Sequence, residues 1–158
     1  MNYDSGAQPQ EDKMATALMF SAIILGLSLA PIDIFHLNLS PVFEGVAKNV
    51  GLVIYILGML LVMASMNANE FAETTVSIQE GRGQKVIDTG IYSLVRHPMY
   101  TGFIFFITGV NLWLGTYLSL LLSLTFLAIA LRSRINIEEK TLLNDLEGYD
   151  DYCKNCLL

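Results

Sequence analysis

The sequence predicts an all-α polytopic membrane protein with about four transmembrane helices, and three observations support this prediction. Hydrophobic residues make up 53% of the 158-residue chain and charged residues only 15%, whereas a soluble domain carries about a quarter charged residues. Three long windows, 14–32, 49–69 and 98–131, contain no Asp, Glu, Lys or Arg. The nine Lys and Arg residues are also distributed unequally between the segments that separate these windows.

The first two windows each suit one membrane crossing. They hold 19 and 21 residues, and about 20 residues of helix span a hydrocarbon layer about 30 Å thick. We expect a first helix over 14–35, retained rather than cleaved, because the acidic residues Glu11 and Asp12 precede it in place of the basic start of a signal peptide. Residues 1–13 are expected to form a disordered polar tail, and residues 14–66 to contain two transmembrane helices.

The third window is too long for one crossing and slightly short for two. It holds 34 residues and has Gly115 near its centre, flanked by Trp113 and Tyr117. Glycine permits a tight turn, and Trp and Tyr favour the membrane interface. We therefore expect a helical hairpin with short helices over 98–113 and 117–134. Apolar residues at helical spacing after 134 indicate either that the last helix continues out of the membrane or that a short amphipathic helix follows it.

The long segment 70–96 joins the second and third helices. Its stretch TTVSIQ (74–79) alternates like a short strand, and EGRG (80–83) is typical of a turn. In a protein this small, a segment of that length is usually functional or disordered. Its Val, Ile and Tyr residues argue against disorder.

Basic residues predict the orientation of the chain in the membrane. With four crossings, eight of the nine Lys and Arg residues share the side of the two termini, and only Lys48 lies on the other side. The positive-inside rule then places both termini and the 70–96 segment in the cytoplasm. We expect an integral protein of a bacterial inner membrane or an ER-like membrane, surrounded by membrane lipids. No basic stripe is present, so no nucleic-acid partner is expected.

The cysteines and one histidine have no assigned role. Cys153 and Cys156 form a C-x-x-C pair, but a structural zinc site needs a second pair of ligands and a redox motif needs a thioredoxin-like context. We therefore expect two reduced thiols and no metal. His36 is expected to be a loop or interface residue.

The start of the third helix carries more polar residues than a simple membrane anchor requires. Arg96-His97-Pro98 precedes the apolar run, and proline suits the first turn of a helix. The free N–H groups of such a helix start attract anions. His97 and Tyr100 share a face of that helix. If the hairpin is antiparallel, the far end of the next helix returns to the same membrane surface and brings Arg134, Glu138 and Glu139 with it. Each residue alone could be an anchor or a solvated side chain, but together they predict a site.

Two stretches carry a resemblance to a known family. QKVIDTGIYSLVRHPMYTG (84–102) and RINIEEKTLLNDLEGYDDY (134–152), separated by the apolar hairpin, resemble the isoprenylcysteine carboxyl methyltransferases, which belong with the membrane phospholipid N-methyltransferases. The resemblance implies a methyltransferase core over 67–158 and an S-adenosyl-L-methionine site built on the cytoplasmic loop. It also implies a lipid-like methyl acceptor that enters from the bilayer.

The resemblance also implies roles for individual residues. Arg134 would face the acceptor's carboxylate, Glu138 would neutralise the ammonium of the cofactor, and His97 and Glu139 complete the expected catalytic set. The expected cofactor-binding residues are Gln79, Gln84, Lys85, Val86, Ile87, Tyr92, His97, Pro98, Met99, Tyr100 and Glu138. The chain departs from its eukaryotic relatives in a shorter loop between positions 79 and 84. Relatives often continue beyond the position of Leu158 with a basic, proline-containing tail, so one wall of the pocket is expected to be missing or supplied differently.

Several readings of the function stay open at this stage. A carboxylate acceptor is already ionised and needs no base, whereas an amine acceptor must lose a proton to Glu139 or to a neutral His97. The first reading is O-methylation of a lipidic carboxylate, and the nearest alternative is N-methylation of a phospholipid amine. More distant alternatives are a sterol-type NADPH reductase and a non-catalytic membrane scaffold. The sequence does not indicate the oligomeric state.

Overall fold

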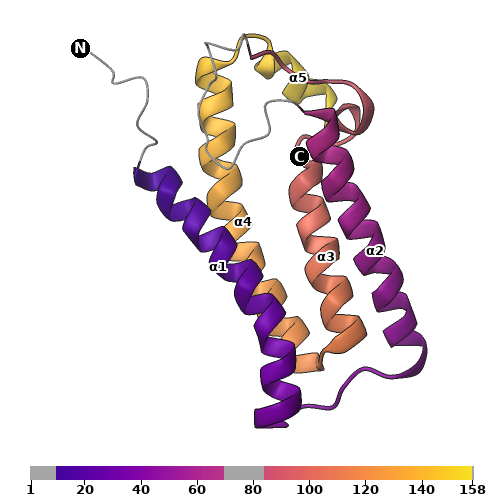
Figure 1. The fold of residues 1–158 in the computed structure, drawn as a ribbon. Helices are drawn as coiled ribbons and strands as arrows, with labels where there is room; N and C mark the ends of the chain where they lie inside the picture. The colour runs from indigo at the N-terminus through magenta and orange to yellow at the C-terminus, as the bar shows by residue number, and fades with distance from the viewer. Residues whose placement is uncertain (1–9, 70–83, 158) are drawn as a thin grey trace.

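The computed structural model describes residues 10–69 and 84–157, and within them the chain is helical (Figure 1). The elements are α1 (Gln10–Ile32), the π-helical turn η1 (Asp33–Leu37), α2 (Gly45–Ala68), the 3-10 turn η3 (Gly90–Ser93), α3 (Pro98–Leu114), α4 (Tyr117–Asp145) and α5 (Tyr149–Asn155). Extended pairing in this part of the chain is limited to two isolated bridges, Val42 with Thr116 and Val95 with Leu157. The predicted all-α class is confirmed.

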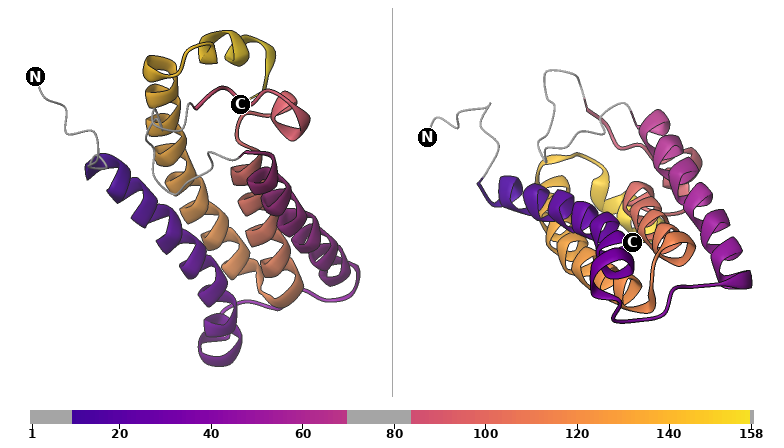
Figure 2. Two further views of the ribbon diagram at one scale, coloured as in Figure 1. Left: turned by 45° about the horizontal axis from the view of Figure 1, so that its top comes forward. Right: turned by 60° about the horizontal axis from the view of Figure 1, so that its bottom comes forward.

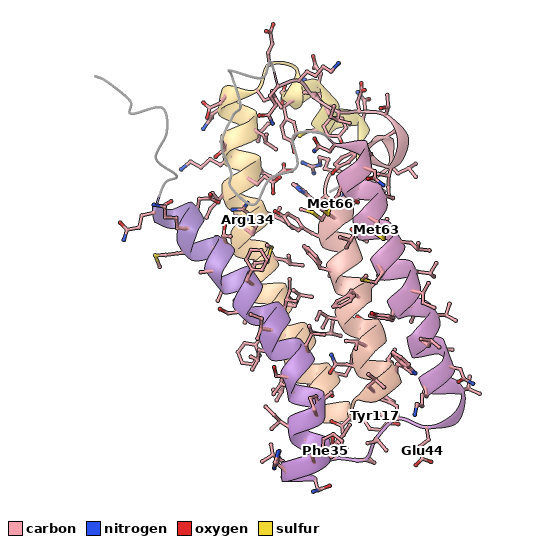
Figure 3. All side chains as sticks on the ribbon, viewed as in Figure 1. Phe35, Glu44, Met63, Met66, Tyr117 and Arg134 are labelled. Atoms are coloured by element: carbon pink, nitrogen blue, oxygen red, sulfur yellow. The ribbon has the colours of Figure 1, made fainter. Side chains whose placement is uncertain are left out.

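Three helical segments are long and apolar enough to cross a membrane. They are Gln10–Leu37, Gly45–Ala68 and Tyr117–Asp145, while α3 is a shorter apolar helix. Large apolar side chains such as Met63 and Met66 of α2 are exposed, and α2 buries only Gly51, Gly58 and Ser65 (Figure 3). A helix that turns so many large apolar side chains outward needs an apolar solvent. The chain is therefore a polytopic membrane protein.

The helices pack as two pairs, α2 with α3 and α1 with α4, and the α3–α4 hairpin joins the two pairs. Helix α2 lies along α3, α1 lies along α4, and the Gly115–Thr116 turn joins α3 to α4 as an antiparallel hairpin (Figures 1 and 2). As a result, the start of α1, the start of α3, the far part of α4 and the whole of α5 lie at the same end of the bundle.

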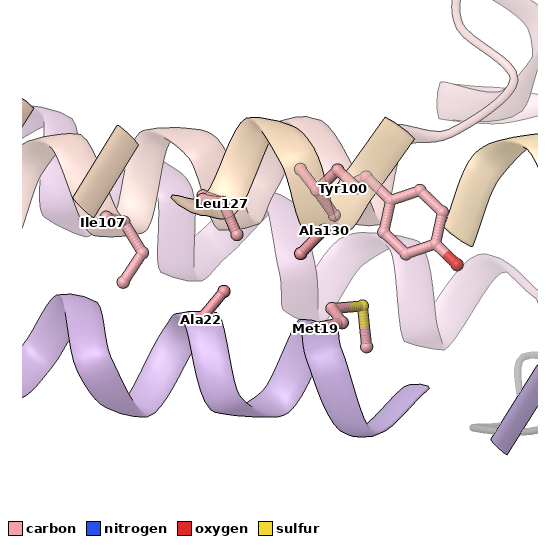
Figure 4. Close-up of a cluster of buried hydrophobic side chains, with 7 residues drawn as sticks. Met19, Ala22, Tyr100, Ile107, Leu127 and Ala130 are labelled. Atoms are coloured by element: carbon pink, nitrogen blue, oxygen red, sulfur yellow. The ribbon is translucent and has the colours of Figure 1, made fainter. Parts of the chain in front are cut away.

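The interior between α1, α3 and α4 is a small apolar cluster (Figure 4). Met19 and Ala22 of α1 face Ile107 of α3 and Leu127 and Ala130 of α4. The cluster reaches Tyr100, which is only 4% exposed. The apolar core therefore ends where the polar residues of the α3 start begin.

One helix boundary differs from the expectation drawn from the sequence. Helix α1 begins at Gln10 rather than at 14, so residues 10–13 of the expected disordered tail are helical, because Asp12 is buried against α4. Helix α4 continues without a break to Asp145, which agrees with the first of the two alternatives for the residues after 134. The expected strand 74–79, the turn 80–83 and residues 1–9 lie outside the described residues.

Candidate active site

The start of α3 is held against the chain end. Pro98 occupies the first turn of α3, and His97 is its N-cap. The Arg96 backbone N–H donates to the Leu157 carbonyl at 2.8 Å, and the Leu157 N–H donates to the Leu94 carbonyl at 3.3 Å. These bonds leave the side chains of Arg96 and His97 free to turn toward α4.

Glu139 of α4 accepts hydrogen bonds from three side chains. Arg96 Nη1 donates to Oε2 at 2.5 Å, while His97 Nε2 at 2.6 Å and the Tyr149 hydroxyl at 2.9 Å both reach Oε1. Because an ionised carboxylate only accepts, we assign the proton of the 2.6 Å contact to His97 Nε2. Burial and the bond to Glu139 raise the pKa of the Tyr149 phenol, so this group remains a donor. Glu139 thus joins α3, α4 and α5.

A second chain of contacts runs through Tyr100. Its hydroxyl donates to Glu138 Oε2 at 2.6 Å and accepts from Arg134 Nε at 3.2 Å. The Tyr100 ring stacks on the His97 ring with centroids 5.4 Å apart, and His97 Nδ1 lies 4.0 Å from Glu138 Oε2. The structure therefore brings together Arg96, His97, Tyr100, Arg134, Glu138 and Glu139, called here the α3–α4 polar cluster.

Arg134 also contacts α1. Its Nη1 donates to Asp12 Oδ1, and at 2.9 Å to Thr16 Oγ1. Asp12 is 0% exposed and Arg134 is 2% exposed. The residue expected to meet an acceptor carboxylate is therefore already paired with a carboxylate of the protein.

Tyr92 lies in a neighbouring set of contacts that fastens α5 to η3. Its carbonyl accepts from the Tyr152 hydroxyl at 2.6 Å and from Cys156 Sγ at 3.2 Å, and its own hydroxyl donates to the Ser65 carbonyl at 3.4 Å. Cys153 Sγ lies 3.4 Å from Arg96 Nη1. The two cysteines are free thiols with packing roles, and no metal-ligand group occurs among the described residues.

A cavity has residues of the segment around η3 and of the start of α5 in its lining. It has a volume of about 520 Å³, and its lining includes Val86, Asp88 and Ser93 together with Gly148 and Tyr152. Gln84 and Ile87 are partly buried, and Lys85 is exposed. Of the expected cofactor-binding residues, Gln79 lies outside the described residues. Pro98 is buried, and Met99 packs partly against the apolar cluster.

Sequence reasoning missed three residues that the structure brings to this site. Asp12 was assigned to a disordered tail, although a buried arginine such as Arg134 needs an anionic partner. Arg96 is named at the start of the third helix, but no role in the site is predicted for it. Tyr149 lies in the second stretch that carries the family resemblance (134–152), but no periodicity places it beside Glu139. An acidic residue just ahead of a membrane helix was the one available signal for Asp12.

Comparison with known proteins identifies the family to which the chain belongs. A family model described as Phospholipid methyltransferase matches residues 46–146, which contain nearly all of α2, the α3–α4 hairpin and the whole α3–α4 polar cluster. The chain belongs to the phospholipid methyltransferase family. Residues outside the matched range include Asp12 and Tyr149, so the family match does not extend to these two partners of the cluster.

Two curated proteins are similar to part of this phospholipid methyltransferase family member. The Protein-S-isoprenylcysteine O-methyltransferase of Schizosaccharomyces pombe is 31% identical over 92 residues, covering 58% of this chain and 39% of that protein. The protein of the same name from Saccharomyces cerevisiae is 32% identical over 96 residues, covering 56% of this chain and 40% of that protein. The match thus spans about two fifths of each relative. No solved structure gives a significant match.

Proposed function

We propose that this protein is an integral-membrane methyltransferase that uses S-adenosyl-L-methionine and transfers a methyl group to a lipid-like carboxylate. The observation that carries the proposal is the return of α4 beside the start of α3, which sets Tyr100 2.6 Å from Glu138 and His97 2.6 Å from Glu139. The names of the two fungal relatives, both isoprenylcysteine O-methyltransferases, support an acceptor of this kind.

The polar cluster fits the charges of the cofactor. Arg96 Nε is buried and lacks a hydrogen-bond partner within the described ranges, and a buried unsatisfied donor is costly unless a ligand satisfies it. Glu138 uses Oε2 for Tyr100 and keeps a 28% exposed side chain. Arg96 and the N–H groups at the start of α3 would hold the cofactor's carboxylate, and Glu138 would hold its ammonium.

The reaction needs positioning more than acid–base chemistry. When bound, S-adenosyl-L-methionine supplies a methyl group on a positively charged sulfur. The acceptor's carboxylate oxygen forms the new O–CH₃ bond as the S–CH₃ bond breaks, which gives a methyl ester and S-adenosylhomocysteine without a proton transfer. The protein's contribution is to align the two reactants. Arg134, with its planar fork of donors, is the residue expected to hold the acceptor's carboxylate.

N-methylation of a phospholipid amine is the second candidate. Two observations favour it: the description of the matching family, and the pairing of Arg134 with Asp12, which leaves no net positive charge there for a carboxylate. An amine would have to lose a proton. Glu139 is a poor base for this step because three donors already occupy it, so the predicted alternative base is His97.

We also propose that the end of the bundle carrying the polar cluster faces the cytoplasm. This orientation supplies the cofactor from the aqueous side, while the acceptor reaches the site from the bilayer. It follows from the basic residues near that end, including Arg96, Arg132 and Lys140.

Transfer of a labelled methyl group tests the proposed function. The purified protein in lipid nanodiscs would be given labelled S-adenosyl-L-methionine and either N-acetyl-S-farnesylcysteine or a phosphatidylethanolamine. We expect base-labile label, the mark of a methyl ester, on the farnesylcysteine. Label on the amine instead would replace the first candidate by the second. Label on neither acceptor, with folded protein, would refute both.

A further inference from the structure

The Asp12–Arg134 pair lies at the contact of α1 with α4 and is closed to solvent. Figure 3 labels Arg134 on α4. Removing one member of such a pair leaves an uncompensated buried charge, which is strongly unfavourable. Arg134 therefore needs an anionic partner at every stage of a catalytic cycle. In this structure the partner belongs to the protein.

The same guanidinium also reaches the polar cluster. Arg134 Nε donates to the Tyr100 hydroxyl at 3.2 Å, and that hydroxyl donates to Glu138 at 2.6 Å. An acceptor carboxylate held by Arg134 would thus lie near the carboxylate expected to hold the cofactor. A carboxylate that binds a guanidinium through two nitrogens uses either Nη1 with Nη2 or Nε with Nη2. In Arg134, Nη1 contacts Asp12 and Thr16 and Nε contacts Tyr100, so either mode takes the place of one of these partners. Asp12 is the carboxylate among these three partners, so it is the one that repels an incoming carboxylate.

We propose that Asp12 is an acceptor-specificity residue: an acceptor carboxylate binds by displacing Asp12 from Arg134, and Asp12 returns when the acceptor becomes an ester. This inference rests on the proposed function and adds a residue of α1 to its acceptor site. Exchange of one carboxylate for another keeps Arg134 paired throughout. Methylation removes the charge of the acceptor, so the product no longer competes with Asp12 and is released.

A groove beside the pair provides room for the apolar part of the acceptor. It has a volume of about 610 Å³ and is lined by residues of α1, among them Glu11, Ala15 and Leu18, and by Ser133 and Ile137 of α4. Ser133 precedes Arg134, and Ala15 lies one turn beyond Asp12. A lipid chain lying in this groove would bring its polar end to the ion pair.

Comparing the affinity for an acid with the affinity for its ester separates the contribution of Arg134 to binding from the contribution of the lipid chain. The probes are N-acetyl-S-farnesylcysteine and its methyl ester, titrated into the full chain in nanodiscs without cofactor. We expect Asp12→Asn to tighten binding of the acid by at least about tenfold, the scale of one charged hydrogen bond, and to leave binding of the ester unchanged. The same acid-to-ester ratio in Asp12→Asn and in the unaltered protein would overturn the proposal.

Two control variants separate charge from packing. Thr16→Val removes a neutral contact of Arg134 on the same face of α1. Glu44→Gln removes an exposed acidic charge at the start of α2, at the opposite end of the bundle. Both are expected to leave the acid-to-ester ratio unchanged. If Thr16→Val changes the acid-to-ester ratio as much as Asp12→Asn does, loosened helix packing rather than competition for Arg134 governs acid binding.

A measurement on the unaltered protein covers the case in which Asp12→Asn does not fold. Displacement of Asp12 frees the first turns of α1, so saturating acid should speed amide hydrogen exchange in residues 10–16, and saturating ester should not. Equal exchange with both probes would overturn the proposal. Neither readout needs methyl transfer, so a failed transfer assay with a normal acid response would count against the proposed function alone.

Discussion

At the scale of single residues, Glu139 is the residue that assembles the site. It accepts from Arg96 of the segment before α3, from His97 at the α3 start and from Tyr149 of α5. Three donors on one largely buried carboxylate fix its position and theirs. Glu139 is therefore better suited to hold His97 and Arg96 in place than to take a proton from an acceptor, and a catalytic role for it stays a prediction.

Replacing Glu139 tests this positioning role. Glu139→Gln puts an amide N–H₂ against at least one of the three donors, and we expect it to lower the free energy of unfolding by about 2–3 kcal/mol, the cost of a broken charged contact. Tyr149→Phe removes one donor and should cost about 1 kcal/mol. Thermal unfolding in detergent, followed by the fluorescence of Trp113, measures both. Equal losses in the two variants would show that the Tyr149 bond alone matters.

Residue patterns predicted part of this cluster. His97, Tyr100, Arg134, Glu138 and Glu139 were placed together because a hairpin of two apolar helices must return its ends to the same surface. Asp12 could not be found in this way, because its burial depends on how α1 crosses α4 rather than on any local spacing. The partners that Glu138 and Glu139 meet likewise depend on how α4 lies against α3 and α5.

At the scale of elements, glycines define how α2 meets α3. Gly51 and Gly58 of α2 are seven residues apart, as are Gly102 and Gly109 of α3, so each pair lies on one helix face. A Cβ at Gly51 would lie 2.6 Å from Leu112 Cβ, and one at Gly109 would overlap the backbone of Tyr55. In a membrane, where helices gain little by leaving lipid, such close backbone approach supplies the packing.

Added bulk at this interface should separate the two helices. We expect Gly109→Ala to lower the free energy of unfolding by about 1–3 kcal/mol, because the new methyl group meets backbone that cannot move aside. Ala64→Leu adds more volume on the exposed side of α2 and should change it by less than about 0.5 kcal/mol. The same detergent unfolding experiment compares them. A Gly109→Ala variant as stable as the parent would contradict the packing described here.

Sequence patterns did not predict how the end of α1 is held. Asp33 accepts from the Leu39 N–H at 2.8 Å, from the Ser40 hydroxyl at 3.1 Å and from the Thr116 hydroxyl at 2.6 Å. Thr116 also caps α4 together with Ser119. The windows free of charge predicted that helices exist and roughly where, because hydropathy alone decides that. The windows treat the end of the first helix and the turn of the hairpin as independent features, whereas the carboxylate of Asp33 joins them.

At the scale of the whole molecule, the basic residues predict the orientation of the chain in the membrane. Arg96, Arg132 and Lys140 belong to the end of the bundle that carries the polar cluster, and Lys48 belongs to the opposite end. Reporter fusions in bacterial cells test this assignment. A fluorescent protein that folds only in the cytoplasm should be bright after Leu158 and dark after Glu44, and alkaline phosphatase should give the opposite pattern. The reverse of both patterns would place the site outside the cytoplasm.

The central claim is that the polar cluster formed by α3 and α4 holds S-adenosyl-L-methionine. Calorimetric binding of S-adenosylhomocysteine to the nanodisc-embedded protein tests it most directly, with Glu138→Gln as the site variant and Asp145→Asn, an exposed carboxylate of the same helix, as its match. We predict one molecule bound per chain, affinity at least about tenfold weaker in Glu138→Gln, and unchanged affinity in Asp145→Asn. Absence of binding to the folded protein, or equal affinity in both variants, would contradict the account.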